Sequence, residues 1–189
     1  MKNIIRCEWC GDDPVYIKYH DKEWGRLVKT DKKLFEFLTL EAAQAGLSWI
    51  TILKRRANYA KAFSGFDVKK VAAYTNKDVQ KLMAYEGIIR NRLKIESAIS
   101  NAKLFIQVQK EFGSFRKYIE SFLPNGLPVV NNWKSLSQIP ARTPLSDAIS
   151  ADMKKREFKF FGSVICYAFL QATGYVDDHT TNCFVKNRA

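Results

Sequence analysis

The chain has 189 residues, of which 47% are hydrophobic and 13% aromatic. This composition excludes a disordered chain and is sufficient for one compact domain over residues 1–189, with room for two lobes. Lys and Arg number 31 against 19 Asp and Glu, so the formal net charge is +12, which favours a polyanion such as DNA as the partner because phosphate contacts release condensed counterions.

The sequence contains no apolar run long enough for a signal peptide or a membrane span. We therefore expect a cytoplasmic protein that does not bind membranes. In that compartment its four cysteines are expected to be thiols or metal ligands rather than disulfides.

Hydrophobic spacing and capping residues predict helices along most of the chain. In the first half of the chain, the predicted helices are Asp31–Ala43, Trp49 to the basic residues Lys54–Arg56, Asp67–Val71, and a helix from the capping box Thr75–Asp78 to a stop at Gly87. A longer helix that includes Leu93–Phe105 follows, and another begins at Ser114. The last two run from Thr143 to about Arg156 and over Ser163–Thr173, before Gly174. Alternating strand patterns are scarce, so the expected fold class is all-α.

Both histidines of the chain lie near cysteines, close to its two ends. His179 and Cys183 are four residues apart, which places them on one face if the segment is helical. Cys7, Cys10 and His20 lie near the start. Zinc favours four such ligands in a closed, structural site, and two from each end would clamp the termini together. Spacing alone favours the Cys7 and Cys10 pair at the N-terminal side, and the alternative is that these residues are ordinary core or surface groups.

Five segments, in the same order along nearly the whole chain, resemble the bacterial 3-methyladenine DNA glycosylase I family. They are Tyr16–Gly25 (YIKYHDKEWG), Leu40–Ile50 (LEAAQAGLSWI), Gly87–Arg90 (GIIR), Phe158–Gly162 (FKFFG) and the closing His179–Cys183 (HTTNC). The resemblance implies a helix-hairpin-helix glycosylase fold with a structural zinc. It also implies an enzyme of base excision repair that flips 3-methyladenine out of alkylated duplex DNA and hydrolyses its N-glycosidic bond to leave an abasic site.

The resemblance also implies the residues of the two sites. The zinc ligands would be Cys7, His20, His179 and Cys183, with Cys10 as a spare thiol, and the base pocket would comprise Trp9, Tyr16, Tyr19, Glu41 and Trp49. A base-flipping enzyme needs flat aromatic faces and a hydrogen-bonding group for the base edge, so these residue types suit the task. Aromatic residues at helical spacing are more often part of a core.

Glu41 is the candidate catalytic residue, and it follows an apolar run at the inner end of a helix. A carboxylate is costly to bury there without a role, although an exposed helix end is the alternative. Methylation at N3 gives adenine a positive charge, which a buried carboxylate among electron-rich rings would favour over normal adenine. We therefore assign Glu41 to recognition of the base edge and not to activation of water.

Two segments are candidates for contact with DNA. Gly46 and Leu47 lie between two helices, where an apolar wedge can enter the base stack, and the alternative is a simple helix-helix corner. Gly87–Arg92 joins two other helices, where backbone N–H groups can hold a phosphate. Arg90, Arg92 and Lys94 would add charge; the alternative is a glycine cap flanked by solvated basic residues.

Two positions depart from the family pattern, because Ala42 and Glu157 stand where many relatives have glycine. The first would narrow the floor of the pocket, and the second would alter a helix end.

No Asp occurs between Asp78 and Asp147, where many helix-hairpin-helix glycosylases are expected to place one, and Glu111 is the nearest carboxylate by spacing. We expect a monomer. The rival interpretations are a zinc-stabilised DNA-binding module without catalysis and a basic scaffold protein.

Overall fold

The computed structural model describes residues 4–186 and is built mainly of helices. The α-helices are α1 (Pro14–Lys22), α2 (Asp31–Gln44), α3 (Trp49–Ala62), α4 (Val68–Ala72), α5 (Asn76–Ala84), α6 (Arg92–Phe112), α7 (Phe115–Glu120), α8 (Pro144–Lys155) and α9 (Ser163–Ala172). Two short strands, β1 (Val129–Val130) and β2 (Val176–Asp177), pair in parallel. The predicted helical class is confirmed, and the bounds of α2, α8 and α9 differ from those predicted by at most one residue.

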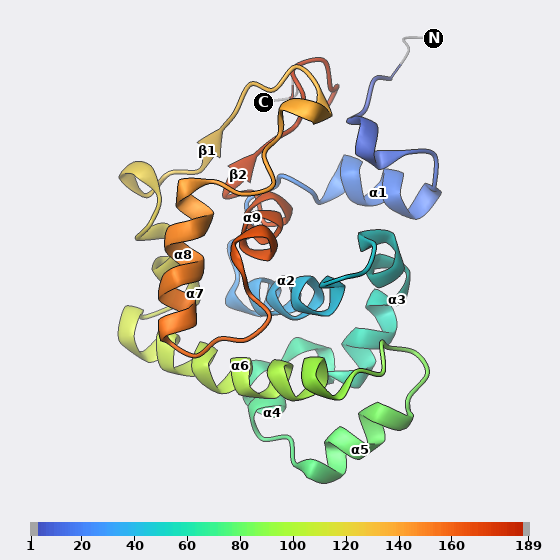
Figure 1. Cartoon of the computed structure of the whole chain (residues 1–189), viewed down its shortest axis with the longest axis vertical. Helices are drawn as coiled ribbons and strands as arrows, with labels where there is room; N and C mark the ends of the chain where they lie inside the picture. Colours follow the sequence, from blue (N-terminus) through green and yellow to red (C-terminus); the bar gives the residue numbers. More distant parts are fainter. Residues whose placement is uncertain (1–3, 187–189) are drawn as a thin grey trace.

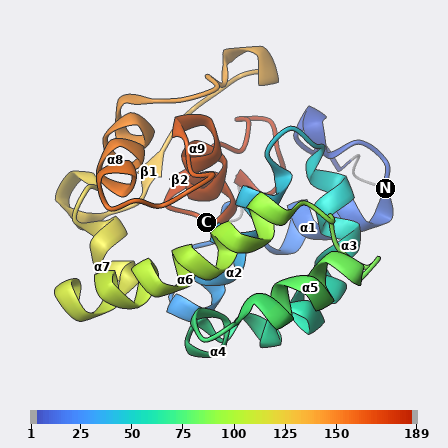
Figure 2. The ribbon, with the colours of Figure 1, turned by 60° about the horizontal axis from the view of Figure 1, so that its bottom comes forward.

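Helix α2 runs through the middle of the molecule, and the other helices pack around it (Figure 1). Its side chains Leu34, Phe35 and Leu38 are completely buried, and the ring of Phe35 lies 5.3 Å from that of Phe105 on α6. Helix α6 crosses one side of α2, with α4 and α5 beyond it (Figure 2). Helices α8 and α9 pack against each other on the opposite side.

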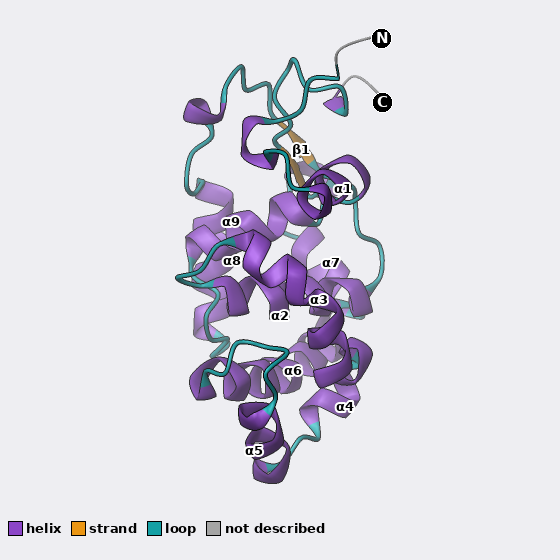
Figure 3. Cartoon of the chain, turned by 90° about the vertical axis from the view of Figure 1, so that its right-hand side faces the viewer, coloured by secondary structure: helices purple, strands orange, loops and turns teal. Residues whose placement is uncertain are grey.

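The segment before α1 and the segment after β2 meet at one end of the molecule (Figure 3). The backbone N–H of Phe184 donates to the carbonyl oxygen of Ile5 at 2.9 Å, so the described parts of the two ends are joined directly. Within residues 4–186, no helix has the length and apolar character needed to cross a membrane.

The predicted end of α3 at Lys54–Arg56 is wrong, because the helix continues to Ala62. Basic residues often mark the last turn of a helix, but here one of them joins helices. The guanidinium of Arg56 binds Glu36 of α2 at 2.6 Å and Glu23 at 2.8 Å. The charge of Arg56 is therefore used in the middle of α3, not at its end.

The predicted stop of α5 at Gly87 is also wrong. The capping box forms as expected, with the Thr75 backbone N–H donating to Asp78 at 2.9 Å, but the helix ends at Ala84. A Cβ atom on Gly87 would lie 2.5 Å from the ring of Tyr85. Gly87 is therefore needed for the close approach of this ring and not for a helix cap.

Two further differences concern burial and a helix that the pattern did not predict. Leu93, counted among the apolar positions of α6, is 66% exposed at the start of that helix. Helix α1 begins after Asp13, whose carboxylate accepts the Val15 N–H at 2.9 Å, and Pro14 occupies its first position. This pair of start signals is present in the sequence.

Candidate active site

A cavity of about 280 Å³ opens between α1, the end of α2, the start of α3 and one face of α9. The five residues expected to form a base pocket all line it: Trp9, Tyr16, Tyr19, Glu41 and Trp49. The lining also includes residues that were not predicted, among them Trp24, Gln44, Tyr167 and Gln171. Trp24 lies within the first quoted motif, whereas α9 is so apolar that its sequence indicates only a buried helix.

Two short elements place the aromatic side chains of the pocket. A single 3-10 turn, Glu8–Cys10, carries Trp9, and Tyr16 and Tyr19 lie three residues apart on one face of α1. The centroids of the Trp9 and Tyr16 rings are 5.1 Å apart, and those of Tyr19 and Trp49 are 5.6 Å apart. The rings therefore form a connected aromatic wall.

Glu41 contributes the carboxyl group of the pocket and is only 2% exposed. Among residues 4–186, its Oε2 atom has no hydrogen-bond partner, and neither has the indole Nε1 of Trp9 or of Trp49. Burial raises the pKa of Glu41 to about 8. Because buried polar atoms are nearly always satisfied in native proteins, these three atoms indicate that the cavity binds a polar partner.

Asp178 holds the α9 side of the cavity in place, although the sequence did not indicate it. Its carboxylate is fully buried and accepts hydrogen bonds from Asn131 Nδ2 at 2.8 Å and Trp133 Nε1 at 2.7 Å. It also accepts from Gln171 Nε2 at 2.6 Å and from the Tyr167 hydroxyl. Asp178 thus joins the two pocket residues of α9 to the chain that follows β1.

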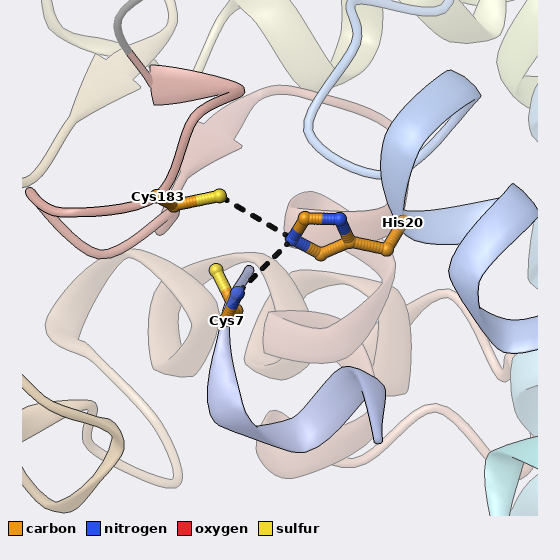
Figure 4. Close-up of side chains that lie close together, drawn as sticks. All are labelled: Cys7, His20 and Cys183. Atoms are coloured by element: carbon orange, nitrogen blue, oxygen red, sulfur yellow. Dashed lines mark hydrogen bonds between the residues drawn. The ribbon is translucent and has the colours of Figure 1, made fainter. Parts of the chain in front are cut away.

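Three of the four predicted zinc ligands form one buried group (Figure 4). The ligand atoms of Cys7, His20 and Cys183 all lie within 4.8 Å of one another, and His20 Nε2 is 3.5 Å from Cys183 Sγ. Hydrogen bonding from Cys7 and His20 lowers the pKa of the Cys183 thiol, which favours the thiolate form that binds metals. Cys10 is not a member of this group.

His179 lies beside the group, with its ring centroid 5.2 Å from that of His20. Its Nε2 atom is buried and has no partner among the described residues. Nδ1 of His179 bonds to Asp177 at 2.8 Å, and Nδ1 of His20 bonds to Asp21 at the same distance. Such carboxylates orient metal-binding imidazoles and leave Nε2 for the metal. The donor set therefore fits a zinc ion.

Two tryptophans of the pocket pack against the two histidines that are predicted to bind zinc. The ring of Trp9 lies 5.3 Å from that of His20, and the ring of Trp24 lies 4.6 Å from that of His179. Trp9 and Trp24 are themselves 4.9 Å apart. The position of these two pocket residues is thus tied to the packing of the two imidazoles.

The predicted DNA-contacting residues lie on two exposed turns. Gly46 has a φ of +77° and precedes Leu47, which is 40% exposed in the turn between α2 and α3. Arg90 and Arg92 are exposed, and Arg92 pairs with Glu96 at 3.3 Å. These residues are accessible to a duplex, and their contact with DNA stays a prediction.

Lys94 differs from the other predicted cations because its ammonium group already has partners within the protein. It donates to the carbonyl oxygens of Ala43 at 2.9 Å and Ala45 at 2.5 Å. Burial lowers its pKa. Its side chain therefore points to the end of α2.

The remaining residues singled out from the sequence lie outside the pocket lining. Glu111 pairs with Arg156 through two contacts of 2.6 and 2.9 Å. Glu157 follows α8 with a φ of +70°, a conformation that favours glycine, and the expected effect of this position on the helix end stays a prediction. Ala42 is buried but does not line the cavity.

Comparisons with known proteins show the family to which the chain belongs. A sequence model of the family described as methyladenine glycosylase matches residues 9–186. The chain is 49% identical to DNA-3-methyladenine glycosylase 1 of Escherichia coli, over 94% of this chain and 95% of the relative. It is 46% identical to DNA-3-methyladenine glycosylase of Haemophilus influenzae, over 96% and 97%.

Solved structures of such enzymes superpose closely on the chain. A crystal structure of 3-methyladenine DNA glycosylase I has a TM-score of 0.92 at 48% identity and covers 95% of this chain and 98% of that chain. A structure of the Staphylococcus aureus enzyme, determined for its recognition of 3-methyladenine, has a TM-score of 0.92 at 36% identity and covers 96% of each chain. The chain belongs to the methyladenine glycosylase family.

Proposed function

We propose that the protein is a monofunctional DNA glycosylase that removes 3-methyladenine from alkylated duplex DNA. Water adds to C1′ of the deoxyribose as the bond from C1′ to N9 breaks. The base takes the bonding electron pair and leaves as neutral 3-methyladenine, the proton of the attacking water passes to solvent, and the strand is left with an abasic site. The observation that carries this proposal is the buried carboxyl group of Glu41, whose Oε2 has no hydrogen-bond partner among residues 4–186 and which lies in an aromatic pocket of suitable size for one base.

The positive charge of the methylated base explains how this pocket selects its substrate. Aromatic faces and the carboxylate of Glu41 stabilise a cation in a site from which water is excluded. Normal adenine has no such charge, so it does not offset the free energy needed to ionise Glu41. Because a cationic purine is already a good leaving group, the enzyme supplies mainly extrusion, positioning and electrostatic fit.

Contact with the duplex is assigned to the two exposed turns. Helices α5 and α6, joined by residues 85–91, correspond to the helix-hairpin-helix, whose backbone and basic residues Arg90 and Arg92 bind phosphates. Leu47 enters the base stack from the turn between α2 and α3 and helps to keep the target base extruded.

A structural zinc ion completes the proposed enzyme. Cys7, His20, His179 and Cys183 would hold it, and a bound zinc supplies folding free energy by joining the two ends of the chain. The donor set supports this assignment because three ligand atoms already cluster and the fourth, His179 Nε2, is buried without a partner among residues 4–186. We propose one domain over residues 1–189, acting as a monomer.

Release of bases from methylated DNA tests the proposed activity. The protein is incubated with a duplex that carries 3-methyladenine, and the released bases and abasic sites are measured by chromatography. We expect stoichiometric release of 3-methyladenine, and a strongly reduced rate for the variant Glu41→Gln. Duplex binding without any abasic product would instead indicate a non-catalytic DNA-binding module, and weak, salt-labile binding without preference for lesions would indicate a scaffold.

A further inference from the structure

Lys94 joins two parts of the molecule that the proposed function uses separately. It lies in the first turn of α6, directly after the hairpin segment that is proposed to bind phosphates. Its ammonium group contacts the carbonyl oxygens of Ala43 and Ala45, about fifty positions earlier in the chain. Those carbonyls belong to the end of α2, one residue before the turn that carries Leu47.

The two contacts of Lys94 satisfy carbonyl groups at the C-terminal end of α2. The last carbonyl groups of a helix have no intrahelical partners. At the end of α2 the chain turns at Gly46, with φ +77°, and the backbone N–H of Leu47 donates to the carbonyl oxygen of Gln44 at 2.6 Å. The carbonyl oxygens of Ala43 and Ala45 accept from Lys94 instead. A cation at this position satisfies two carbonyls and interacts favourably with the helix dipole. The lysine thus fixes the point at which the chain leaves α2.

A second contact joins the hairpin segment to the other helix of the turn. The hydroxyl oxygen of Tyr59, on α3, accepts the backbone N–H of Ile89 at 3.2 Å. Both helices that flank Leu47 are therefore bonded to the hairpin region, α2 through Lys94 and α3 through Tyr59. These contacts link the hairpin segment and the first turn of α6 to both helices that flank Leu47.

We propose that Lys94 is a positioning residue, not a phosphate contact, and that it sets the distance between the phosphate-binding hairpin and the Leu47 wedge. This inference rests on the proposed action on duplex DNA. When the hairpin is held on the backbone, Lys94 keeps the turn at the depth from which Leu47 reaches the stack. Its loss leaves the base pocket intact but misplaces the wedge.

The test compares Lys94→Met, which keeps the length of the side chain but removes its donors, with Lys103→Met. Lys103 is an exposed residue of the same helix, nine positions on and therefore on about the opposite face, so it controls for loss of charge. Three quantities are measured: excision from duplex and from single-stranded DNA carrying the same lesion, binding of free 3-methyladenine, and the salt dependence of duplex binding.

We expect Lys94→Met to lower kcat/KM on the duplex about tenfold or more, as small misplacements do. Excision from single strands and binding of the free base should stay within about twofold of the wild type, and the slope of log K against log salt should not change. Lys94→Arg, which keeps donors, should recover most of the duplex activity. A slope smaller by about one would identify a phosphate contact and overturn the proposal.

Equal losses in duplex excision, in single-strand excision and in binding of the free base would also overturn the proposal, because they would indicate a general structural role. If Lys94→Met does not fold, Tyr59→Phe replaces it in the test, because it removes the second contact. Tyr59→Phe should show the same selective loss on the duplex. Wild-type duplex activity in Tyr59→Phe would contradict the proposed link between the hairpin and the Leu47 wedge. Failure of the wild-type protein to release 3-methyladenine would be a different result, since it would refute the proposed function itself.

Discussion

Replacing Glu41 by Gln should stabilise the protein while it removes most of the activity. Burial raises the pKa of Glu41 from an ordinary 4.5 to about 8, so folding favours its protonated form by about 5 kcal/mol. The preference of the folded state for protonated Glu41 contributes fully to the free energy of unfolding below pH 4.5, where the unfolded chain is protonated too. This contribution is lost as the pH rises to 8, because the unfolded chain ionises first. Gln keeps the shape of the neutral carboxyl and does not titrate. At pH 7 the variant Glu41→Gln should therefore be more stable than the wild type by about 3 kcal/mol.

The effect of Glu41→Gln on activity has the opposite sign. A carboxylate about 4 Å from a positive charge, at an effective dielectric constant of about 20, contributes about 4 kcal/mol. At pH 7 about 1 kcal/mol of this is needed to remove the proton from Glu41. The variant should lose the remainder, so kcat/KM on the duplex should fall roughly 10²-fold. Wild-type kcat/KM should rise about tenfold per pH unit up to about pH 8, whereas the variant's profile should be flat across that range.

Three measurements check these expectations for Glu41→Gln. Denaturant unfolding at pH 5, 7 and 8.5 gives the difference in stability, excision assays give the pH profile, and quenching of tryptophan fluorescence gives the affinity for free 3-methyladenine. Affinity should fall in parallel with the excision rate, because the free base can take the proton of Glu41 and be held as a cation. If the variant bound the free base normally yet could not excise it, Glu41 would be a catalytic base and the reasoning would be wrong.

Three other predictions concern the metal, the wedge and a glycine. One zinc ion per chain should co-purify with the protein and with Cys10→Ser but not with His20→Ala, and metal analysis showing the reverse would contradict the ligand set. Leu47→Ala should lower excision from duplexes about tenfold or more while changing excision from single strands little; equal losses would rule out a wedge. Gly25→Ala should weaken metal binding and lower the free energy of unfolding by about 3 kcal/mol, since Gly25 has a φ of +73° and a Cβ there would lie 2.5 Å from the ring of His179. Chelator titration and unfolding curves check this, and an unchanged metal affinity would show that the ring can move.

Local signals predicted much of the fold, because helices depend mainly on neighbouring residues. The cap of α8 at Thr143 and the N-cap role of Ser114 on α7 follow from a few adjacent positions. The end of α3 was mispredicted for the opposite reason. Arg56 contacts Glu23, 33 positions away, and no local pattern distinguishes such a residue from one at a helix end.

The same distinction applies to the candidate site. Glu41 could be predicted, because a carboxylate after an apolar run is unusual within one segment. The bonds of Asp178 to Asn131, 47 positions away, and of Lys94 to Ala43, 51 positions away, could not be predicted, since each residue looks like an ordinary polar residue in its own segment. The motifs identified residues that line the cavity, whereas the residues that hold them in place become visible only when distant segments are brought together.

The chemistry of the pocket is consistent with the absence of a second carboxylate in it. Of the candidates, Glu111 is bound to Arg156 on an exposed surface, and no Asp lies between Asp78 and Asp147. A site with one carboxyl group offers a normal adenine no carboxylate to activate water and no charge to stabilise on the neutral base. It stabilises a base that is already positively charged and weakly attached to its sugar. We therefore expect the pocket to act on labile methylated adenine and to leave normal adenine in place, because selection and rate enhancement would both depend on the same charge.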